Sequence, residues 1–391
     1  MPVLTDEARA RDPSRWWWRR ANSRACRWFS RRDALLPIER PAGAPHDGWC
    51  TDPRQESGDR GLSAAAKQGF VGPDRVGARQ TVCNPRSSGE FSLPCRLHPL
   101  SSGKPHMPEP LRFLIAESEP PQARESRRES VGRSSGETYV ETLHLLAPDA
   151  VCHRVKPADR GAALPDRAAL RSYDAVFVTG SPLHLYEDTP ETRREVELMR
   201  AVFAAGVPAF GSCAGLHVAT VAAGGTVRPG RNGREAGFAR RITLTDAGRD
   251  HPLLAGRPAS FDAPAFHSDE VETLPERATL LACNTVTQVQ AVEIRHGPGV
   301  FWGVQYHPEL DLYEVAGALR RQADELVREG LAGSHEALEN HARMVEALHH
   351  APEQKDLAWF LGLDEQVTTM GYRLTELRNF IRWAVELRPS P

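Results

Sequence analysis

An α/β fold, with an open and mostly parallel sheet covered by helices on both faces, is the architecture that this sequence predicts. Three observations support it. Short apolar segments, such as residues 174–178, are typical of buried strands. Longer segments between them, such as residues 190–205, carry apolar residues at helical spacing. Two short apolar segments lead directly into polar motifs, as strands do where such a sheet carries its reactive loops.

The elements begin with a short apolar strand at residues 111–115. A polar loop is expected next, followed by a helix that Ser135 can cap and that runs to Leu146. Residues 150–155 are expected to form the second strand. Residues 174–178 are expected to form the third strand, which ends in a glycine-containing turn.

The next helix has signals at both ends. Thr189 can cap it, Pro190 suits its first position, and Gly206 can end it. Further strands are predicted at residues 207–210 and 300–305, where the residues are mostly apolar.

Charge is unevenly distributed along the chain. Residues 1–106 hold 18 Lys+Arg and 11 Asp+Glu, a net charge of +7, whereas the remainder holds 31 and 40, a net charge of −9. The first segment also lacks helical or strand periodicity, so we predict that it is disordered or a non-native extension, with Met107 as the natural start. Its run Trp16-Trp17-Trp18 beside Arg19-Arg20 leaves open contact with nucleic acid or a membrane, or a targeting role. The predicted domains are therefore 1–106, 107–330 and 331–391.

Composition excludes several classes of protein. The sequence has no run of about 18 apolar residues and no apolar stretch typical of a secretory signal. The net charge of −2 gives no general attraction to nucleic acid. Seven cysteines without a CxxC pair argue against structural zinc and favour a reducing cytoplasm. We therefore expect no nucleic-acid or membrane partner.

A candidate nucleophile follows the strand predicted at 207–210. The pattern there is G-x-C-x-G, formed by Gly211, Ser212, Cys213, Ala214 and Gly215. It is the thiol counterpart of the strand-to-helix nucleophile turn, whose glycines permit a tight bend. A thiol there would lie at a helix N-terminus, which favours thiolate, and the N–H of Ala214 would face a developing oxyanion. Taken alone, Cys213 is equally well explained as an ordinary buried cysteine.

A candidate base follows the strand predicted at 300–305. In an extended segment, His307 and Glu309 would project to the same side, and Pro308 favours that conformation. The carboxylate could then orient the imidazole toward the thiol. A polar turn is the alternative interpretation, but two such features in the order Cys, His, Glu favour catalysis.

These two motifs together resemble the class I glutamine-amidotransferase family, most closely the stand-alone domains similar to the amidotransferase part of GMP synthase. The resemblance spans roughly residues 111–326 and implies a flavodoxin-like fold. It also implies that Cys213, His307 and Glu309 form a catalytic triad. No cofactor or metal is implied.

The resemblance assigns further roles around the triad. Residues 179–182 are similar to the family's Ser/Thr-Gly-Gly-Pro turn, which places Gly180 in the substrate pocket and gives Ser181 an oxyanion N–H. The segment from His267 to Asp269 is similar to the family's His-Gly-Asp, whose acid would bind the amino group of glutamine.

Three positions depart from the family pattern. His217 stands where the family has a glutamine in the substrate pocket, and imidazole cannot copy an amide's donor and acceptor pair. Ser181 and Ser268 stand where the family has glycine, which is a milder change because the backbone N–H is kept.

Helices are predicted after the last strand, one marked by Val315 and Leu326, one at residues 334–350 and one containing Leu374 and Ile381. They could form a lid, a docking surface for a synthase or a second subunit, or an appendage packed on the core. Four histidines of this region lack metal-ligand spacing and are expected on solvated helix faces: His335, His341, His349 and His350.

The predicted function is a glutamine amidotransferase or glutaminase that forms a γ-glutamyl thioester on Cys213. No phosphate-binding GxxxxGK[ST] loop is present, so ammonia would pass to a separate synthase. Two alternatives stay open, namely a γ-glutamyl peptide or amide hydrolase with the same triad, and a catalytically weakened binding domain. The oligomeric state is also open, a homo-oligomer included.

Overall fold

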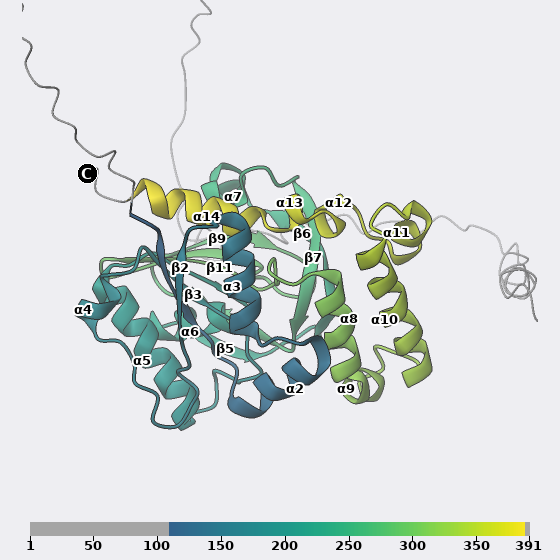
Figure 1. Ribbon diagram of the computed structural model, residues 1–391, viewed down its shortest axis with the longest axis horizontal. Helices are drawn as coiled ribbons and strands as arrows, with labels where there is room; N and C mark the ends of the chain where they lie inside the picture. The colour runs from purple at the N-terminus through teal and green to yellow at the C-terminus, as the bar shows by residue number, and fades with distance from the viewer. Residues whose placement is uncertain (1–108, 388–391) are drawn as a thin grey trace, which may run out of the picture. The chain divides into compact units, whose positions relative to one another are not determined.

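A central nine-stranded sheet organises the protein in a computed structural model that describes residues 109–387 (Figure 1). The prediction for residues 1–106 lies outside the described residues. The strands of the main sheet are β1 (Arg112–Ala116), β2 (Val151–Val155), β3 (Ala175–Val178), β4 (Ala209–Ser212), β6 (Glu235–Leu244), β7 (Ser260–His267), β9 (Ala278–Cys283), β10 (Ala291–His296) and β11 (Gly299–Val304). A separate two-stranded sheet pairs β5 (Thr226–Pro229) with β8 (Asp269–Thr273).

The order of strands across the main sheet is β2-β1-β3-β4-β11-β10-β9-β6-β7. The first five are joined by parallel pairings, and the last four continue the sheet by antiparallel pairings. All strands but β10 and β6 therefore run in the same direction. The predicted mostly parallel α/β sheet is confirmed. The interval between β4 and β11, where only a helix after Cys213 was predicted, supplies strands β5–β10.

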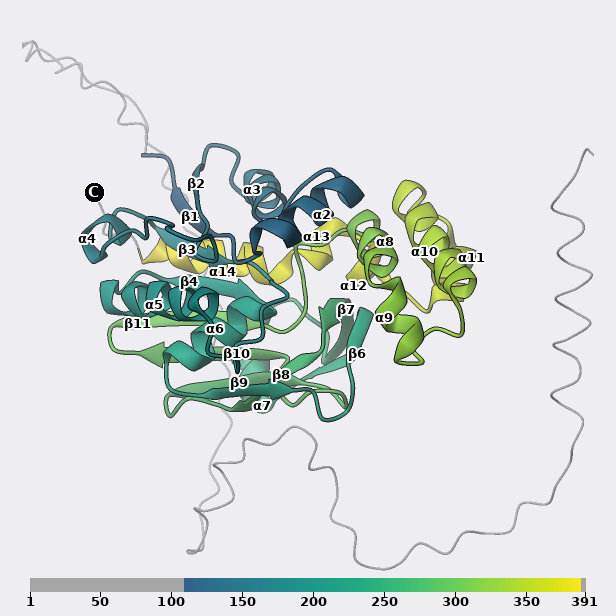
Figure 2. The same cartoon turned by 90° about the horizontal axis from the view of Figure 1, so that it is seen from below.

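Helices cover both faces of this sheet (Figure 2). They are α2 (Pro121–Val131), α3 (Ser135–Leu146), α4 (Arg167–Leu170), α5 (Pro190–Ala205), α6 (Ala214–Ala222), α7 (Asp246–Asp250), α8 (Leu312–Arg321), α9 (Ala323–Arg328), α10 (His335–His350), α11 (Lys355–Leu361), α12 (Glu365–Thr368), α13 (Met370–Arg373) and α14 (Thr375–Glu386). Helices α5 and α6 share one apolar core with the strands, and α3 and α14 share the core on the opposite face. Within the described residues, no helix has the length and apolar character needed to span a membrane.

Local signals placed α5 correctly. The Thr189 hydroxyl accepts a hydrogen bond from the N–H of Thr192, and Pro190 occupies the first helical position. Gly206 ends the helix with a φ of 76°, in the left-handed region that glycine adopts without a steric penalty. Thr189, Pro190 and Gly206 therefore set the two ends of the helix, as predicted.

Two local predictions before β2 were wrong. Helix α2 occupies the expected polar loop, and its only buried side chains are Arg124 and Val131. Ion pairs to distant residues hold this helix in place, such as Arg124 to Asp159 at 2.7 Å. Because the helix does not depend on an apolar face, its sequence lacks the apolar periodicity that would have predicted it. Helix α3 is capped by Ser134 instead of Ser135, because Ser134 completes a reciprocal pair of hydrogen bonds with Glu137.

The C-terminal helix α14, yellow in Figures 1 and 2, buries Phe380 among aromatic side chains of the central strands. The ring centroid of Phe380 lies 5.4 Å from that of Phe177, 5.6 Å from Phe210 and 5.8 Å from Trp302. The helix thus forms part of the main core.

We expect Phe380→Ala to lower the free energy of unfolding by about 3–5 kcal/mol, because it leaves a cavity in a packed aromatic cluster. Val385→Ala is a matched control on the same helix, since Val385 is exposed. Urea denaturation of both variants measures the difference. Equal effects would contradict the assignment of α14 to the core.

Candidate active site

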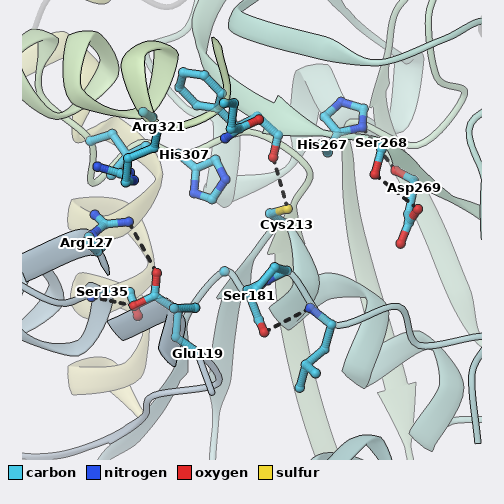
Figure 3. Close-up of a pocket in the computed structure, with 18 of the residues that line it drawn as sticks. Glu119, Arg127, Ser135, Ser181, Cys213, His267, Ser268, Asp269, His307 and Arg321 are labelled. Atoms are coloured by element: carbon cyan, nitrogen blue, oxygen red, sulfur yellow. Dashed lines mark hydrogen bonds and ion pairs between the residues drawn. The ribbon is translucent and has the colours of Figure 1, made fainter. Parts of the chain in front are cut away.

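A cavity of about 360 Å³ opens at the carboxyl ends of the central parallel strands (Figure 3). The loops that follow three neighbouring strands line this cavity. They contribute Gly180 after β3, Cys213 after β4 and His307 after β11. Parallel sheets bring the ends of such strands together, so residues far apart in the sequence meet here.

Cys213 lies at a sharp turn between β4 and α6. Its φ of 52° is unusual for a residue other than glycine, and among the described residues only Arg241 shares this feature. Gly215 makes the turn possible, because a Cβ there would collide with the backbone oxygen of Val178. The thiol lies 3.5 Å from the backbone oxygen of Phe266, and the N–H of Cys213 donates to Val304 of β11.

His307 and Glu309 meet in a turn after β11. The Nδ1 atom of His307 lies 2.8 Å from Oε1 of Glu309, so the two side chains pair as expected. The extended segment that was expected is wrong, because the chain bends there and the N–H of Leu310 donates to the carbonyl of His307. The turn still brings the side chains together because its ends close through this backbone hydrogen bond.

The environment of His307 favours its protonated form. Burial by itself lowers the pKa of an imidazole, but the charge of Glu309 and hydrogen bonds with Cys213 and Glu309 outweigh burial and raise the pKa of His307 to about 10. Gly180 leaves room for the ring, since a Cβ at that position would lie 2.6 Å from Cε1 of His307.

A hydrogen-bond chain that the sequence analysis did not find supports Glu309. Ser212 donates to Oε1 of Glu309 at 2.9 Å, so the Tyr139 hydroxyl, 2.7 Å from Ser212 Oγ, must donate to Ser212. All three side chains are buried. No local pattern indicates this chain, because Tyr139 and Glu309 lie 170 positions apart.

We expect Ser212→Ala to lower kcat on the order of tenfold, because Glu309 would lose a hydrogen bond that fixes its position. KM should change little, since Ser212 does not line the cavity. Steady-state kinetics separate these parameters, and Tyr139→Phe should show a smaller loss because Ser212 can still donate. Ser172→Ala, at an exposed serine, is the control. A rise in KM without a fall in kcat would contradict a positioning role.

Asp269, at the start of β8, meets the turn after β3 at one end of the cavity. Asp269 Oδ2 lies 2.7 Å from Nδ1 of His184, a residue that the sequence analysis did not name. His184 stacks on Tyr186 with ring centroids 5.2 Å apart. This end therefore offers a carboxylate beside an imidazole.

His217 and His267 are both buried and both line the cavity. Burial lowers the pKa of His217 to about 4, so its ring is neutral, and its Nε2 lies 2.8 Å from Gln305 Oε1. His267 contacts Glu235 through Nε2 at 2.8 Å and the backbone oxygen of Asp269 through Nδ1. Both ring nitrogens of His267 thus have protein partners.

The predicted oxyanion residues flank Cys213. Ala214 is the first residue of α6, where main-chain N–H groups lack partners within the helix. Ser181 lines the cavity, and its hydroxyl donates to the backbone oxygen of Ser118 at 2.9 Å and accepts from the N–H of Leu183. In the part of the chain that the structure describes, no group of histidine, cysteine or acidic side chains is arranged to hold a metal ion.

Comparisons with known proteins bear on these features. The family model for glutamine amidotransferase class-I matches residues 150–322. The chain is 37% identical over 281 residues to a gamma-glutamyl-L-1-hydroxyisopropylamide hydrolase from Pseudomonas sp., covering 70% of this chain and 92% of that protein. It is 37% identical over 105 residues to a glutamine-hydrolysing GMP synthase subunit from Methanospirillum hungatei, covering 27% of this chain and only 52% of that protein.

The fold also has a solved counterpart. A glutamine amidotransferase from Thermotoga maritima superposes with a TM-score of 0.50 at 19% identity, covering 71% of this chain and 99% of that structure. At this identity the likeness concerns the arrangement of strands and helices.

Proposed function

Because this chain belongs to the class I glutamine amidotransferase family, we propose that it hydrolyses γ-glutamyl amides through a thioester on Cys213. The observation that carries the proposal is the shared cavity, in which Cys213 at a strained turn lies with the paired side chains of His307 and Glu309. Such a grouping provides a nucleophile, a proton carrier and a group that orients the carrier.

In the proposed reaction, the thiolate of Cys213 attacks the γ-carbonyl carbon and a C–S bond forms. The N–H groups of Ser181 and Ala214 would stabilise the negative oxygen of the tetrahedral intermediate. His307 gives its proton to the amide nitrogen, the C–N bond breaks and the amine leaves. Water then gives a proton to His307, attacks the thioester and releases glutamate, which restores the thiolate and the protonated imidazole.

The raised pKa of His307 supports this proton route. With a pKa of about 10, the imidazole carries a proton at neutral pH and is ready to act as the acid for the leaving amine. Asp269 is suited to bind the α-amino group of the glutamyl moiety, as the family resemblance implied. Neutral His217 donates from Nε2 to Gln305, which leaves Nδ1 free to accept a single hydrogen bond from the same moiety.

We favour hydrolysis over transfer of ammonia to a synthase because of the share of each relative that this chain matches. The match to the Pseudomonas hydrolase covers 92% of that protein, whereas the match to the Methanospirillum GMP synthase chain covers 52%. Release of ammonia to a separate synthase is the second candidate function, favoured by the relatives that are GMP synthase subunits.

Incubation of the full chain with glutamine and with N-alkyl γ-glutamyl amides tests the proposal, with ammonia, free amine and glutamate as readouts. We expect glutamate and amine from the N-alkyl amides, and covalent labelling of Cys213 by the glutamine-like electrophile diazo-oxo-norleucine. Hydrolysis of glutamine alone would favour the second candidate. If no γ-glutamyl compound is cleaved, both functions are refuted.

A further inference from the structure

The cavity continues past His307 to a second end, away from Asp269. In Figure 3, Arg127 and Arg321 lie on the His307 side of Cys213, and Asp269 lies on the other side. Arg234, Glu119 and Glu325 also line the cavity. Apart from Asp269 and the His307–Glu309 pair, three guanidinium groups and two carboxylates therefore line the cavity.

The two carboxylates already have partners. Glu119 accepts a hydrogen bond from the N–H of Ser135 at 3.0 Å and lies 3.6 Å from Arg127. Glu325 lies 3.1 Å from Arg234. Arg127 also pairs with Glu314 at 2.9 Å, so the charges of Arg127 and Arg234 are balanced.

Among the described residues, Arg321 is the one of these three cations that has no direct carboxylate partner. It forms no hydrogen bond or ion pair with the residues 109–387 that the structure describes, and its Nη1 atom is buried without a partner. Burial and the neighbouring charge of Arg127 lower the pKa of Arg321 to about 10, and the charges of Glu119 and Glu314 offset only part of this shift. Holding a partly buried cation without an acceptor costs free energy, and a bound anion would offset that cost.

The reaction geometry indicates which end of a substrate reaches Arg321. The leaving nitrogen takes its proton from His307, so it must lie on the His307 side of the thioester carbon. If the glutamyl moiety lies toward Asp269, any group attached to that nitrogen points toward the end of the cavity that contains Arg321.

We propose that Arg321 binds a carboxylate carried by the leaving amine, so that the preferred substrates are γ-glutamyl amino acids. This inference rests on the proposed hydrolysis of γ-glutamyl amides. It adds a substrate class, because it separates amides of amino acids from amides of uncharged amines.

A matched pair of substrates tests the inference. In γ-glutamyl-alaninol a CH₂OH group replaces the carboxylate of γ-glutamyl-alanine, and the rest of the molecule is the same. This alaninol compound is also the γ-glutamyl-1-hydroxyisopropylamide in the name of the Pseudomonas hydrolase, so a preference for it would contradict the inference. We expect kcat/KM of the unaltered protein to favour γ-glutamyl-alanine by about tenfold or more, as a charge-assisted pair typically provides. Arg321→Gln should reduce this ratio to about one, because glutamine carries no charge.

Arg320→Gln is the matched control on the same helix. Arg320 pairs with Glu339 at 3.0 Å and with Glu346 at 2.7 Å, both on α10, and does not line the cavity. The control should keep the preference for γ-glutamyl-alanine. A ratio of kcat/KM near one in the unaltered protein would overturn the inference. An equal fall in kcat/KM for both substrates in Arg321→Gln would also overturn it, because it would place Arg321 at the glutamyl moiety.

Binding separates this inference from the proposed function. Isothermal titration of Cys213→Ala with each compound needs no turnover, and Cys213→Ala/Arg321→Gln repeats it without the cation. We expect the first protein to bind γ-glutamyl-alanine about tenfold tighter than γ-glutamyl-alaninol and the second to bind both alike. Absence of hydrolysis with this pattern would refute the function and support the subsite, whereas hydrolysis without it would do the reverse.

Discussion

Cys213→Ala should abolish release of amine and ammonia from γ-glutamyl compounds, with a fall in kcat of roughly 10⁴–10⁶-fold. The reason is chemical, since alanine cannot form the thioester through which the proposed reaction runs. Cys152→Ala is the matched control, because burial raises the pKa of the Cys152 thiol to about 11 and makes it a poor nucleophile. Stopped assays for glutamate measure both variants.

Retention of activity in Cys213→Ala would contradict the proposed function.

A second readout concerns the backbone. The φ of 52° at Cys213 is strained for alanine as it is for cysteine, whereas glycine adopts it readily. Cys213→Gly should therefore have a higher Tm than Cys213→Ala, by thermal unfolding. Equal Tm values would show that the turn stores no strain.

His307→Gln should lower kcat by about 10³–10⁴-fold, because glutamine cannot pass a proton between the thiol, the leaving amine and water. His335→Gln is the control, since His335 is exposed and pairs with Asp324 on the surface. Diazo-oxo-norleucine labelling should slow in parallel with hydrolysis. An unchanged kcat would mean that another group carries the proton.

The same variant gives a test of pH dependence. The pKa of His307 is raised from 6.5 when unfolded to about 10 in the fold, so its protonated form stabilises the fold fully below pH 6.5. This stabilisation is lost as pH rises from 6.5 through about 10. The unfolding free energy of the unaltered protein, relative to His307→Gln, should fall across that window in urea denaturation. A difference that does not change with pH would contradict the pairing with Glu309.

Features with local signals could be predicted from the sequence. Helix α5 carries its own cap, first-turn proline and terminal glycine, and the turn at Cys213 requires glycine on each side. Helix α2 could not be predicted in this way. Its Arg127 pairs with Glu314, 187 positions away, so its stability comes from contacts that no local pattern contains.

The residues of the candidate site fall into the same two groups, those that a local motif indicates and those that only the fold brings together. Cys213, His307 and Glu309 could be named because each follows an apolar strand in a short recognisable motif. Ser212 could be recognised only as a member of the motif, and its contact with Tyr139 and Glu309 depends on how α3 packs on the sheet. His184 meets Asp269 across 85 positions, and no local pattern connects the two.

The sequence by itself determined where the five strands with parallel pairings lie, which thiol lies at a tight turn and which imidazole has a carboxylate two positions away. These are properties of short segments, and backbone sterics and hydrogen bonding act within a few residues. Only the tertiary structure decided that Arg321 has no acceptor among the described residues while Arg127 and Arg234 do. Charge pairing depends on distances of a few ångströms between side chains from different elements, and those distances are set by the packing of the whole fold.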